Sequence, residues 1–166
     1  MVIVRITYKM IFISPYYATL TSENPDTGAT TGTSAPIFKQ GNSIAFKGGR
    51  SGKYCTDSSS KLICNVDDVG ALEKFSVFHL GDGVYSLRGA RTNKICSTGN
   101  GNSSVAVCDL EFVRRSDFFT IKDVGNRMVS IKSLRHNEYC TDDDNGFICN
   151  RDTVGPWESF SWQSFD

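Results

Sequence analysis

Six cysteines in this 166-residue chain fall into three pairs whose spacing recurs along the sequence. The words YCTDSSSKLICN at 54–65 and YCTDDDNGFICN at 139–150 each separate two cysteines by the same eight residues, and KICSTGNGNSSVAVCD carries a third pair on a longer loop. The three pairs are Cys55 and Cys64, Cys96 and Cys108, and Cys140 and Cys149. Paired thiols of this kind form disulfides, bind a metal or fill a core.

Hairpin geometry decides between these uses only in part. Two tip residues, Ser59-Ser60, place Cys55 opposite Cys64, where β carbons lie about 4.5–5.5 Å apart, near disulfide reach. A tight turn at Asn145-Gly146 would instead shift the third hairpin by two residues and separate its cysteines. Two alternatives stay open: three disulfides in oxidising surroundings, or six buried core thiols, which would suit assembly inside a cell. The Cys-x8-Cys spacing does not match a zinc knuckle, so we expect no metal site.

Other chemistry is weakly encoded. The acidic run Asp142–Gly146 fails the calcium-loop test because residue 153 is threonine rather than glutamate. The chain has two histidines, and neither has a serine or cysteine in a recognisable nucleophile motif. It has no GxGxxG word and no phosphate-binding loop. We therefore predict no catalytic residues, no cofactor and a protein that is not an enzyme.

The cysteine pairs lie inside a repeated unit of about 42 residues. Each copy opens with an alternating strand, continues through the two cysteine-bearing strands of a hairpin, and closes with a strand whose phenylalanine is followed two residues later by another apolar residue. The opening strands are 43–48, 85–90 and 129–134, and the closing strands are 72–78, 116–122 and 157–163. The predicted core residues are Phe75, Phe119, Phe160, Trp157 and Trp162, with Trp157 plugging the barrel mouth or a repeat junction.

Three copies of a four-stranded unit predict an all-β, closed, pseudo-threefold structure, because one copy cannot bury its apolar face alone and closure removes exposed sheet edges. The architecture that fits is a β-trefoil, a six-stranded barrel capped by three hairpins. We assign 1–22 to an N-terminal arm, 23–40 to a linker rich in Gly, Ser, Thr and Pro, and 41–166 to the trefoil, with repeats at about 41–83, 84–127 and 128–166.

Residues 41–163 resemble a fascin-like β-trefoil, a group related in fold to fibroblast growth factors and ricin-type lectins. The words that carry the resemblance are GKYCTD, LICNVDDVG and NEYCTDDDNGFICNRDTVGPWESF, and the second repeat departs most, with RRSDFF in place of the Gly-x-x-Glu-x-Phe word. Similar cysteine-bearing hairpins occur in trefoil modules of phage tail and fibre proteins. The resemblance implies the fold far more than the function, because this fold hosts filament bundlers, lectins, growth factors and virion modules.

The N-terminal segment stands outside the repeat. VIVRITYKMIF at 2–12 alternates partly like a strand, and 23–36 reads as a flexible linker. An apolar strand beyond such a linker is an aggregation liability unless another chain pairs with it, so we expect a docking arm. A segment that folds back on its own trefoil and an uncleaved leader are the alternatives. The predicted assembly residues are Val2, Val4, Ile6, Tyr8, Met10, Ile11, Tyr16 and Tyr17.

These features together favour a virion accessory component, a capsid decoration or fibre-type protein of a bacteriophage. Its arm would bind capsid proteins or neighbouring subunits, and its exposed trefoil would contact cell-surface carbohydrate. The candidate sugar-binding residues are Asp57, Asp142, Asp144, Asn145 and Asn150. A free lectin-like module, secreted or cytoplasmic, is the alternative, and a fascin-like actin-binding protein is a third. A formal net charge of zero argues against nucleic acid as a partner, and the chain lacks the long apolar run that membrane insertion requires.

Overall fold

The structure is a computed structural model that describes residues 9–14, 17–21, 35–99 and 103–165. These residues form fourteen strands and two single-turn 3-10 helices. None of them belongs to a helix long and apolar enough to cross a membrane. Contacts divide the chain into two units, 1–32 and 33–166, and each is described by itself below.

The first unit contains a β-hairpin. Strand β1, Lys9–Ser14, pairs antiparallel with β2, Tyr17–Thr21, and places Phe12 opposite Ala18. The strand predicted over 2–12 therefore overlaps β1 only at its C-terminal end. Five of the predicted assembly residues, Val2, Val4, Ile6, Tyr8 and Tyr16, lie outside the described residues.

The second unit contains three repeats of four strands, as the sequence predicted. The first repeat has β3 (Ser43–Lys47), β4 (Tyr54–Asp57), β5 (Leu62–Val66) and β6 (Phe75–Gly81). The second has β7 (Val84–Arg88), β8 (Ile95–Thr98), β9 (Ala106–Leu110), the 3-10 helix η1 (Arg115–Asp117) and β10 (Phe119–Gly125). The third has β11 (Met128–Ser133), β12 (Glu138–Asp143), β13 (Gly146–Arg151), the 3-10 helix η2 (Pro156–Glu158) and β14 (Ser159–Phe165).

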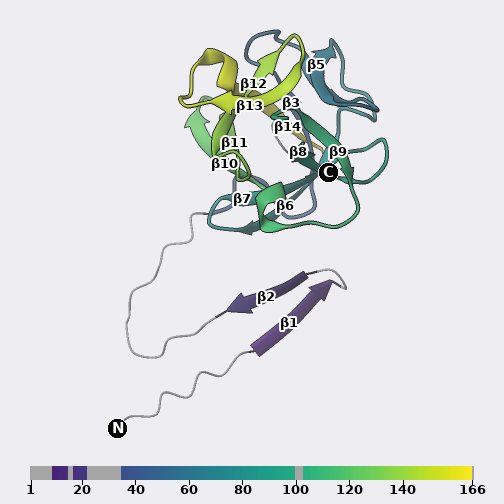
Figure 1. Cartoon of the computed structure of the whole chain (residues 1–166), viewed down its shortest axis with the longest axis vertical. Helices are drawn as coiled ribbons and strands as arrows, with labels where there is room; N and C mark the ends of the chain where they lie inside the picture. The colour runs from purple at the N-terminus through teal and green to yellow at the C-terminus, as the bar shows by residue number, and fades with distance from the viewer. Residues whose placement is uncertain (1–8, 15–16, 22–34, 100–102, 166) are drawn as a thin grey trace. The chain divides into compact units, whose positions relative to one another are not determined.

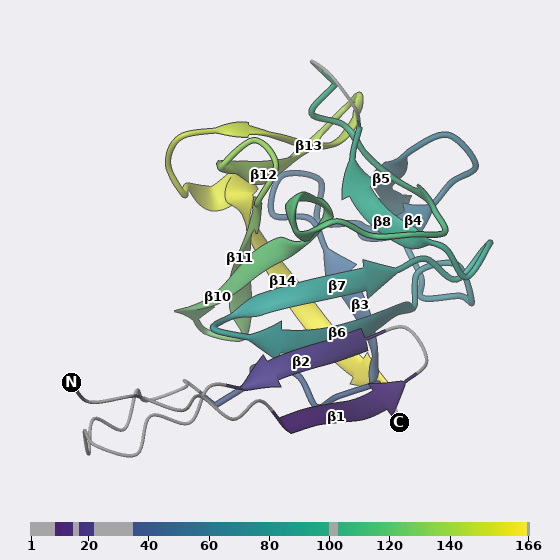
Figure 2. The same cartoon turned by 60° about the horizontal axis from the view of Figure 1, so that its bottom comes forward.

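The first and last strands of the repeats close a six-stranded barrel. Antiparallel ladders join β3 to β6, β6 to β7, β7 to β10, β10 to β11, β11 to β14, and β14 back to β3 (Figure 1). The middle strands form three hairpins, β4–β5, β8–β9 and β12–β13, which contact one another at one end of the barrel (Figure 2). This is the β-trefoil architecture. Closure leaves the six barrel strands without a free edge, which is why twelve short strands suffice for a stable fold.

The hairpin registers resolve the cysteine question. Ser58 donates its N–H to the carbonyl of Lys61, so Ser59-Ser60 form the first tip, and Cys55 lies opposite Cys64. In the third hairpin Asp143 pairs with Gly146, so the tip is Asp144-Asn145 and the register does not shift. All three cysteine pairs are joined by disulfides, and each sulfur pair also lies in the buried core, with no free cysteine among the described residues.

The core is built in layers that contain one residue from each repeat. The three aligned phenylalanines Phe75, Phe119 and Phe160 are at most 1% exposed. Opening strands supply the neighbouring layers, one made of Ile44, Tyr85 and Val129 and the other of Phe46, Leu87 and Ile131. Burial of these aromatic and aliphatic side chains stabilises the barrel.

A residue that precedes the repeats completes the core. Phe38 lies within the range assigned to the linker, yet its side chain is only 2% exposed. Its ring meets those of Phe46, Tyr85 and Trp162 edge-on at centroid distances of 6.0, 5.5 and 5.0 Å. The backbone N–H of Ile37 donates to the Tyr85 hydroxyl at 2.9 Å. The packed domain therefore extends back to residue 37.

Each repeat begins its closing strand with the same acidic cap. The Glu73 carboxylate accepts the N–H of Gly70, and the Glu158 carboxylate accepts the N–H of Gly155, at 2.8 and 3.0 Å. Asp117 replaces the glutamate in the second repeat and accepts the N–H of Arg114 at 2.7 Å. RRSDFF therefore differs from the other repeats in the capping side chain and keeps the local structure, because the shorter carboxylate of Asp117 caps an equivalent turn.

Candidate functional site

The outer wall of the barrel carries an open groove beside β14. Groove 1 has a volume of about 540 Å³ and is lined by Lys47, Tyr54, Arg127, Ser161, Trp162, Gln163 and Ser164. The antiparallel pairing of β14 with β3 places Ser161 opposite Lys47. Tyr54 enters from β4, and Arg127 lies in the β10–β11 turn. The groove thus depends on barrel closure, which brings the last strand of the chain next to the first repeat.

Two aromatic rings in groove 1 are held in place by their neighbours. The Lys47 ammonium lies 5.3 Å from the centroid of the Tyr54 ring, within the range of a cation–π contact. Trp162 is half-buried and is packed against Phe38 from inside the barrel. Alternation along β14 turns Trp162 toward the core face, where it pairs with Phe46, whereas Ser161 and Gln163 lie on the opposite face of the strand.

A second groove occupies the equivalent place one third of the way around the barrel. Groove 2 has a volume of about 190 Å³ and is lined by Thr120, Lys122, Ser130, Lys132, Leu134, Asn137 and Tyr139. The pairing of β10 with β11 places Thr120 opposite Lys132, matching Ser161 and Lys47 in groove 1. The Lys132 ammonium lies 5.1 Å from the Tyr139 ring centroid, repeating the Lys47–Tyr54 contact.

The second repeat lacks this arrangement. Arg88 and Ile95 occupy the places of the lysine and the tyrosine, and the two residues pair across β7 and β8. Arg88 donates to the carbonyl of Asn93 at 3.1 Å, so its side chain lies along its own hairpin. An aliphatic residue in the tyrosine position removes the aromatic surface, so the Lys–Tyr feature is present in two of the three repeats.

Positive charge dominates both grooves. Groove 1 contains Lys47 and Arg127, groove 2 contains Lys122 and Lys132, and no carboxylate is among the described residues that line them. Five ion pairs occur within residues 35–99 and 103–165, and none involves these four cations.

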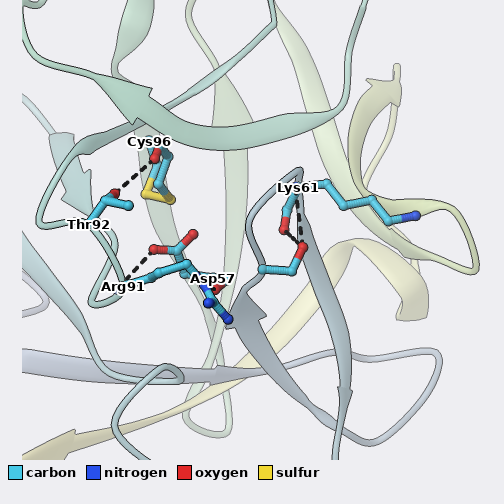
Figure 3. The surroundings of a disulfide bond; sticks show 7 residues. Asp57, Lys61, Arg91, Thr92 and Cys96 are labelled. Carbon is cyan, nitrogen blue, oxygen red and sulfur yellow. Dashed lines mark hydrogen bonds between the residues drawn. A yellow bond between two sulfur atoms is a disulfide. The ribbon is translucent and has the colours of Figure 1, made fainter.

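Two of the predicted sugar-binding residues serve inside the fold. The side chains of Asp57 and Asp142 are each only 2% exposed. Asp57 accepts the N–H of Arg91 from the second repeat at 3.1 Å (Figure 3), and Asp142 accepts the N–H of Ser51 from the first repeat at 2.7 Å. We call these contacts inter-repeat latches. They correct the prediction for both residues, because a carboxylate buried against a neighbouring repeat does not face a sugar.

The third latch uses different chemistry at the same place. Thr98 replaces the aspartate, and its hydroxyl lies 2.9 Å from that of Ser133. Ser133 stands where the other latches have Gly48 and Gly89, and its hydroxyl accepts the N–H of Arg135 at 3.2 Å. Where the acid is lost, a hydroxyl thus replaces the missing carboxylate oxygen. A Cβ at Gly48 or Gly89 would overlap the carboxylate of the facing aspartate, which explains why those two positions are glycine.

The remaining three predicted sugar-binding residues lie at the surface. Asp144 forms an ion pair with Arg50 at 2.6 Å, and its side chain is 82% exposed. The Arg50 hydrogen bond lowers the pKa of Asp144. Asn145 and Asn150 are exposed. None of the three lines either groove, so the structure does not bring the predicted set together.

The core assignment of Trp157 was wrong. Its side chain is 48% exposed, and the Arg50 guanidinium lies 5.3 Å from its ring centroid. The closing strand begins at Ser159, so Trp157 belongs to η2 rather than to the alternation that buries Phe160. Glu158 takes the inward place in that turn, at 8% exposure.

Sequence reasoning missed the grooves, although one signal was present. A lysine precedes a tyrosine by seven positions at Lys47 and Tyr54 and again at Lys132 and Tyr139. The lysine lies at or one residue before the end of an opening strand, and the tyrosine lies at or one residue after the start of the next strand. This spacing places the two residues opposite each other in one ladder. Trp162 carries no such signal, because it reaches groove 1 only through closure of the barrel. No cluster of histidine, cysteine and acidic residues suited to a metal ion occurs among the described residues.

Comparison with known proteins identifies the fold. No family model and no curated protein matches the chain. Among solved structures, the designed threefold-symmetric protein ThreeFoil aligns with a TM-score of 0.64 and 15% identity, over 72% of this chain and 96% of its own. The BEL β-trefoil aligns with a TM-score of 0.66 and 12% identity, over 80% and 99%. SeviL, solved with the asialo-GM1 saccharide, aligns with a TM-score of 0.60 and 10% identity, over 75% and 98%. The chain has a β-trefoil fold.

Proposed function

We propose that this protein is a non-enzymatic carbohydrate-binding trefoil whose sites are groove 1 and groove 2. The observation that carries the proposal is the repeated Lys–Tyr surface, which in groove 1 lies beside Trp162. Sugar rings present a C–H face that packs on aromatic rings and a rim of hydroxyls that hydrogen-bond to polar side chains. Ser161, Gln163 and Ser164 supply such polar groups in the same groove as Tyr54.

The size of groove 1 and the fold are consistent with this proposal. Its volume falls within the range of about 300–1,000 Å³ that is usual for small-molecule sites. SeviL, which shares the fold at 10% identity, was solved with a saccharide bound. This likeness supports a carbohydrate ligand as the first class to test.

We further propose that the N-terminal hairpin anchors the trefoil in an assembly, with a virion as the first candidate. A two-stranded hairpin such as β1–β2 is marginally stable by itself, and the edges of a two-stranded sheet can pair with strands of a partner. The proposed partners are capsid proteins or neighbouring copies of the chain. The free lectin-like module, which needs no anchor, is the competing proposal.

The three disulfides favour one compartment over another. Disulfides persist on virion surfaces and in secreted proteins, and they are rare in a reducing cytoplasm. We therefore favour a virion or secreted location over a cytoplasmic one. The same argument disfavours a cytoplasmic filament bundler.

The sugar-binding proposal is tested by nuclear magnetic resonance with the two tryptophans as reporters. Trp162 lies in groove 1, whereas Trp157 lies on η2 outside both grooves. A panel of mono- and oligosaccharides is titrated into the full chain, and the variant Trp157→Phe assigns the two indole N–H signals. We expect ligands to shift the Trp162 signal and leave that of Trp157 in place. Absence of binding across the panel, or shifts confined to Trp157, would count against the grooves.

The anchoring proposal needs a separate experiment. The full chain and a version that starts at Pro36 are compared in two ways. Light scattering measures their oligomeric state, and pull-down from a preparation of the proposed virion measures their binding to partners. The shorter version retains Phe38 and the whole packed domain. Loss of assembly by a folded shorter chain supports the arm as the anchor. Identical monomers in both cases would leave the free module as the better description.

A further inference from the structure

We infer that the two grooves select acidic saccharides, in which a carboxylate or sulfate accompanies the sugar ring. This inference rests on the proposed function and names its ligand class. It starts from an asymmetry in charge: a chain of zero formal net charge concentrates two cations in each groove and no carboxylate among their described lining residues. Both kinds of ligand could accept hydrogen bonds from these cations, but only an anionic ligand would also gain charge–charge attraction.

The four cations are available to a ligand. Some lysines elsewhere on the described surface pair with acids, as Lys53 does with Asp67 and Lys94 with Glu111. Lys47 and Lys132 instead lie over tyrosine rings, which hold the ammonium near the groove without neutralising its charge. The arrangement occurs in the first and third repeats, and the second repeat has Arg88 and Ile95 at the equivalent positions.

Nearby acids do not cancel this charge. Asp123 follows Lys122 on β10, and its carboxylate accepts the N–H of Gly125 at 2.7 Å, which directs it to the turn. Glu138 precedes Tyr139 on β12, and alternation along the strand places neighbouring side chains on opposite faces. Neither acid lines groove 2.

The geometry also indicates which part of the ligand each side chain would contact. In groove 1 the half-buried Tyr54 ring offers a surface for the C–H face of a sugar, and Ser161 and Gln163 supply hydroxyl and amide groups for the sugar hydroxyls. The lysine ammonium lies over the tyrosine ring, where a carboxylate or sulfate on the sugar would meet it. A free anion uses only the last of these contacts, so the ring and the charge are both required.

Matched ligand pairs test the inference with the full chain. The pairs are 3′-sialyllactose with lactose, trigalacturonate with its methyl ester, and a sulfated chondroitin tetrasaccharide with the unsulfated one. Affinities are measured by calorimetry at low and high salt. We expect the acidic member of at least one pair to bind about tenfold more tightly than its neutral partner, with the advantage lost at high salt. Which pair responds distinguishes a carboxylate from a sulfate.

Charge-matched variants locate the effect. Lys47→Gln with Arg127→Gln alters groove 1, Lys122→Gln with Lys132→Gln alters groove 2, and Lys53→Gln with Lys94→Gln alters neither groove. Each double variant removes two positive charges, so all three have the same net charge. The inference expects the groove variants to lose the preference for the acidic ligand and the control to keep it. Equal losses in the control would overturn the inference, because net charge rather than the grooves would then be responsible.

The outcomes separate this inference from the proposed function. Equal binding of acidic and neutral partners, with shifts at Trp162, overturns the charge preference and leaves the sugar site in place. No binding of any saccharide overturns both. Displacement of the acidic saccharide by inorganic sulfate or a single-stranded RNA at equal concentration overturns saccharide selection, because charge alone would then explain the binding.

Discussion

Asp142 of the third repeat accepts a hydrogen bond from the backbone N–H of Ser51 in the first repeat, with 2.7 Å between the nitrogen and the carboxylate oxygen. The two residues are 91 positions apart in the sequence, and Asp142 is only 2% exposed. The contact joins the end of the repeat array to its beginning. Asp57 makes the corresponding contact between the first and second repeats. The barrel is thus closed by backbone ladders and also by buried polar contacts between hairpins, which are costly to leave unsatisfied.

Replacing the glycine that faces a latch is predicted to open it. Gly48→Ala introduces a Cβ that overlaps the Asp142 carboxylate, so the side chain or the loop must shift. We expect a loss of about 1–3 kcal/mol in the free energy of unfolding, measured by urea denaturation. Ser51→Ala is the control, because the latch uses the backbone N–H of Ser51 and that group is retained. Equal stabilities of wild type and Gly48→Ala would show that the close approach is not needed.

Two substitutions together are predicted to convert the Thr98–Ser133 latch into the aspartate–glycine form of the other two latches. Thr98→Asp alone brings a carboxylate against the Ser133 side chain, and Ser133→Gly alone removes the hydroxyl that meets Thr98 and Arg135. The double variant reproduces the aspartate–glycine combination of the other two latches. We expect both single variants to be destabilised and the double variant to recover, with a coupling free energy of about 1–2 kcal/mol in a double-mutant cycle. Additive losses would mean that the two positions do not form one unit.

The latch at Asp57 is predicted to leave a signature in the pH dependence of stability. Burial raises the pKa of Asp57, and the Arg91 N–H only partly offsets this. A raised folded pKa means that the contribution of Asp57 to stability is greatest below its ordinary value of 3.8 and declines as pH rises through the folded pKa. Asp57→Asn keeps an oxygen for the Arg91 N–H and removes the titration.

The measurement is urea unfolding of both proteins between about pH 3 and pH 7. The stability of wild type minus that of Asp57→Asn is expected to fall as pH rises and then to level off. Asp144→Asn is the control of opposite sign: Arg50 lowers the pKa of Asp144, so the matching difference should rise with pH. A flat Asp57 difference would contradict the raised pKa.

The fold was predictable because the repeat is written directly in the sequence. Alternating strands, turn residues and a recurring phenylalanine predict the same four-stranded unit three times along the chain. Only a closed barrel buries the apolar faces of all three units. The positions of individual side chains were less predictable. Asp57 and Asp142 lie on hairpin strands, where the pattern allows their carboxylates to face either water or the next repeat. A glycine on the neighbouring repeat leaves room for the carboxylate, and the local sequence around each aspartate does not contain that information.

The candidate site was hidden for a related reason. Tyr54 and Trp162 belong to the first and third repeats, and they share a groove only because β14 pairs with β3. Trp157 was misplaced because Pro156 starts a 3-10 turn, which interrupts the strand alternation on which the core assignment relied. Local patterns therefore gave the elements, whereas contacts between distant repeats determined the site.

Phe38 is predicted to link the stability of the fold to the shape of groove 1. It is buried among three aromatic rings, including Trp162, although it precedes the first strand of the barrel. Phe38→Ala should reduce the free energy of unfolding by about 3–5 kcal/mol, measured by urea denaturation. Phe38→Leu retains most of the apolar volume and should lose less.

The groove provides a second readout for the same variants. Because Phe38 supports the inner side of Trp162, its removal should broaden or shift the Trp162 indole N–H signal while that of Trp157 stays in place. Saccharide affinity in groove 1 should fall more in Phe38→Ala than in Phe38→Leu, and groove 2 should keep its affinity because none of its lining residues touches this aromatic cluster. If Phe38→Ala unfolds no more easily than wild type, the residue belongs to the linker after all, and groove 1 must owe the position of Trp162 to β14 alone.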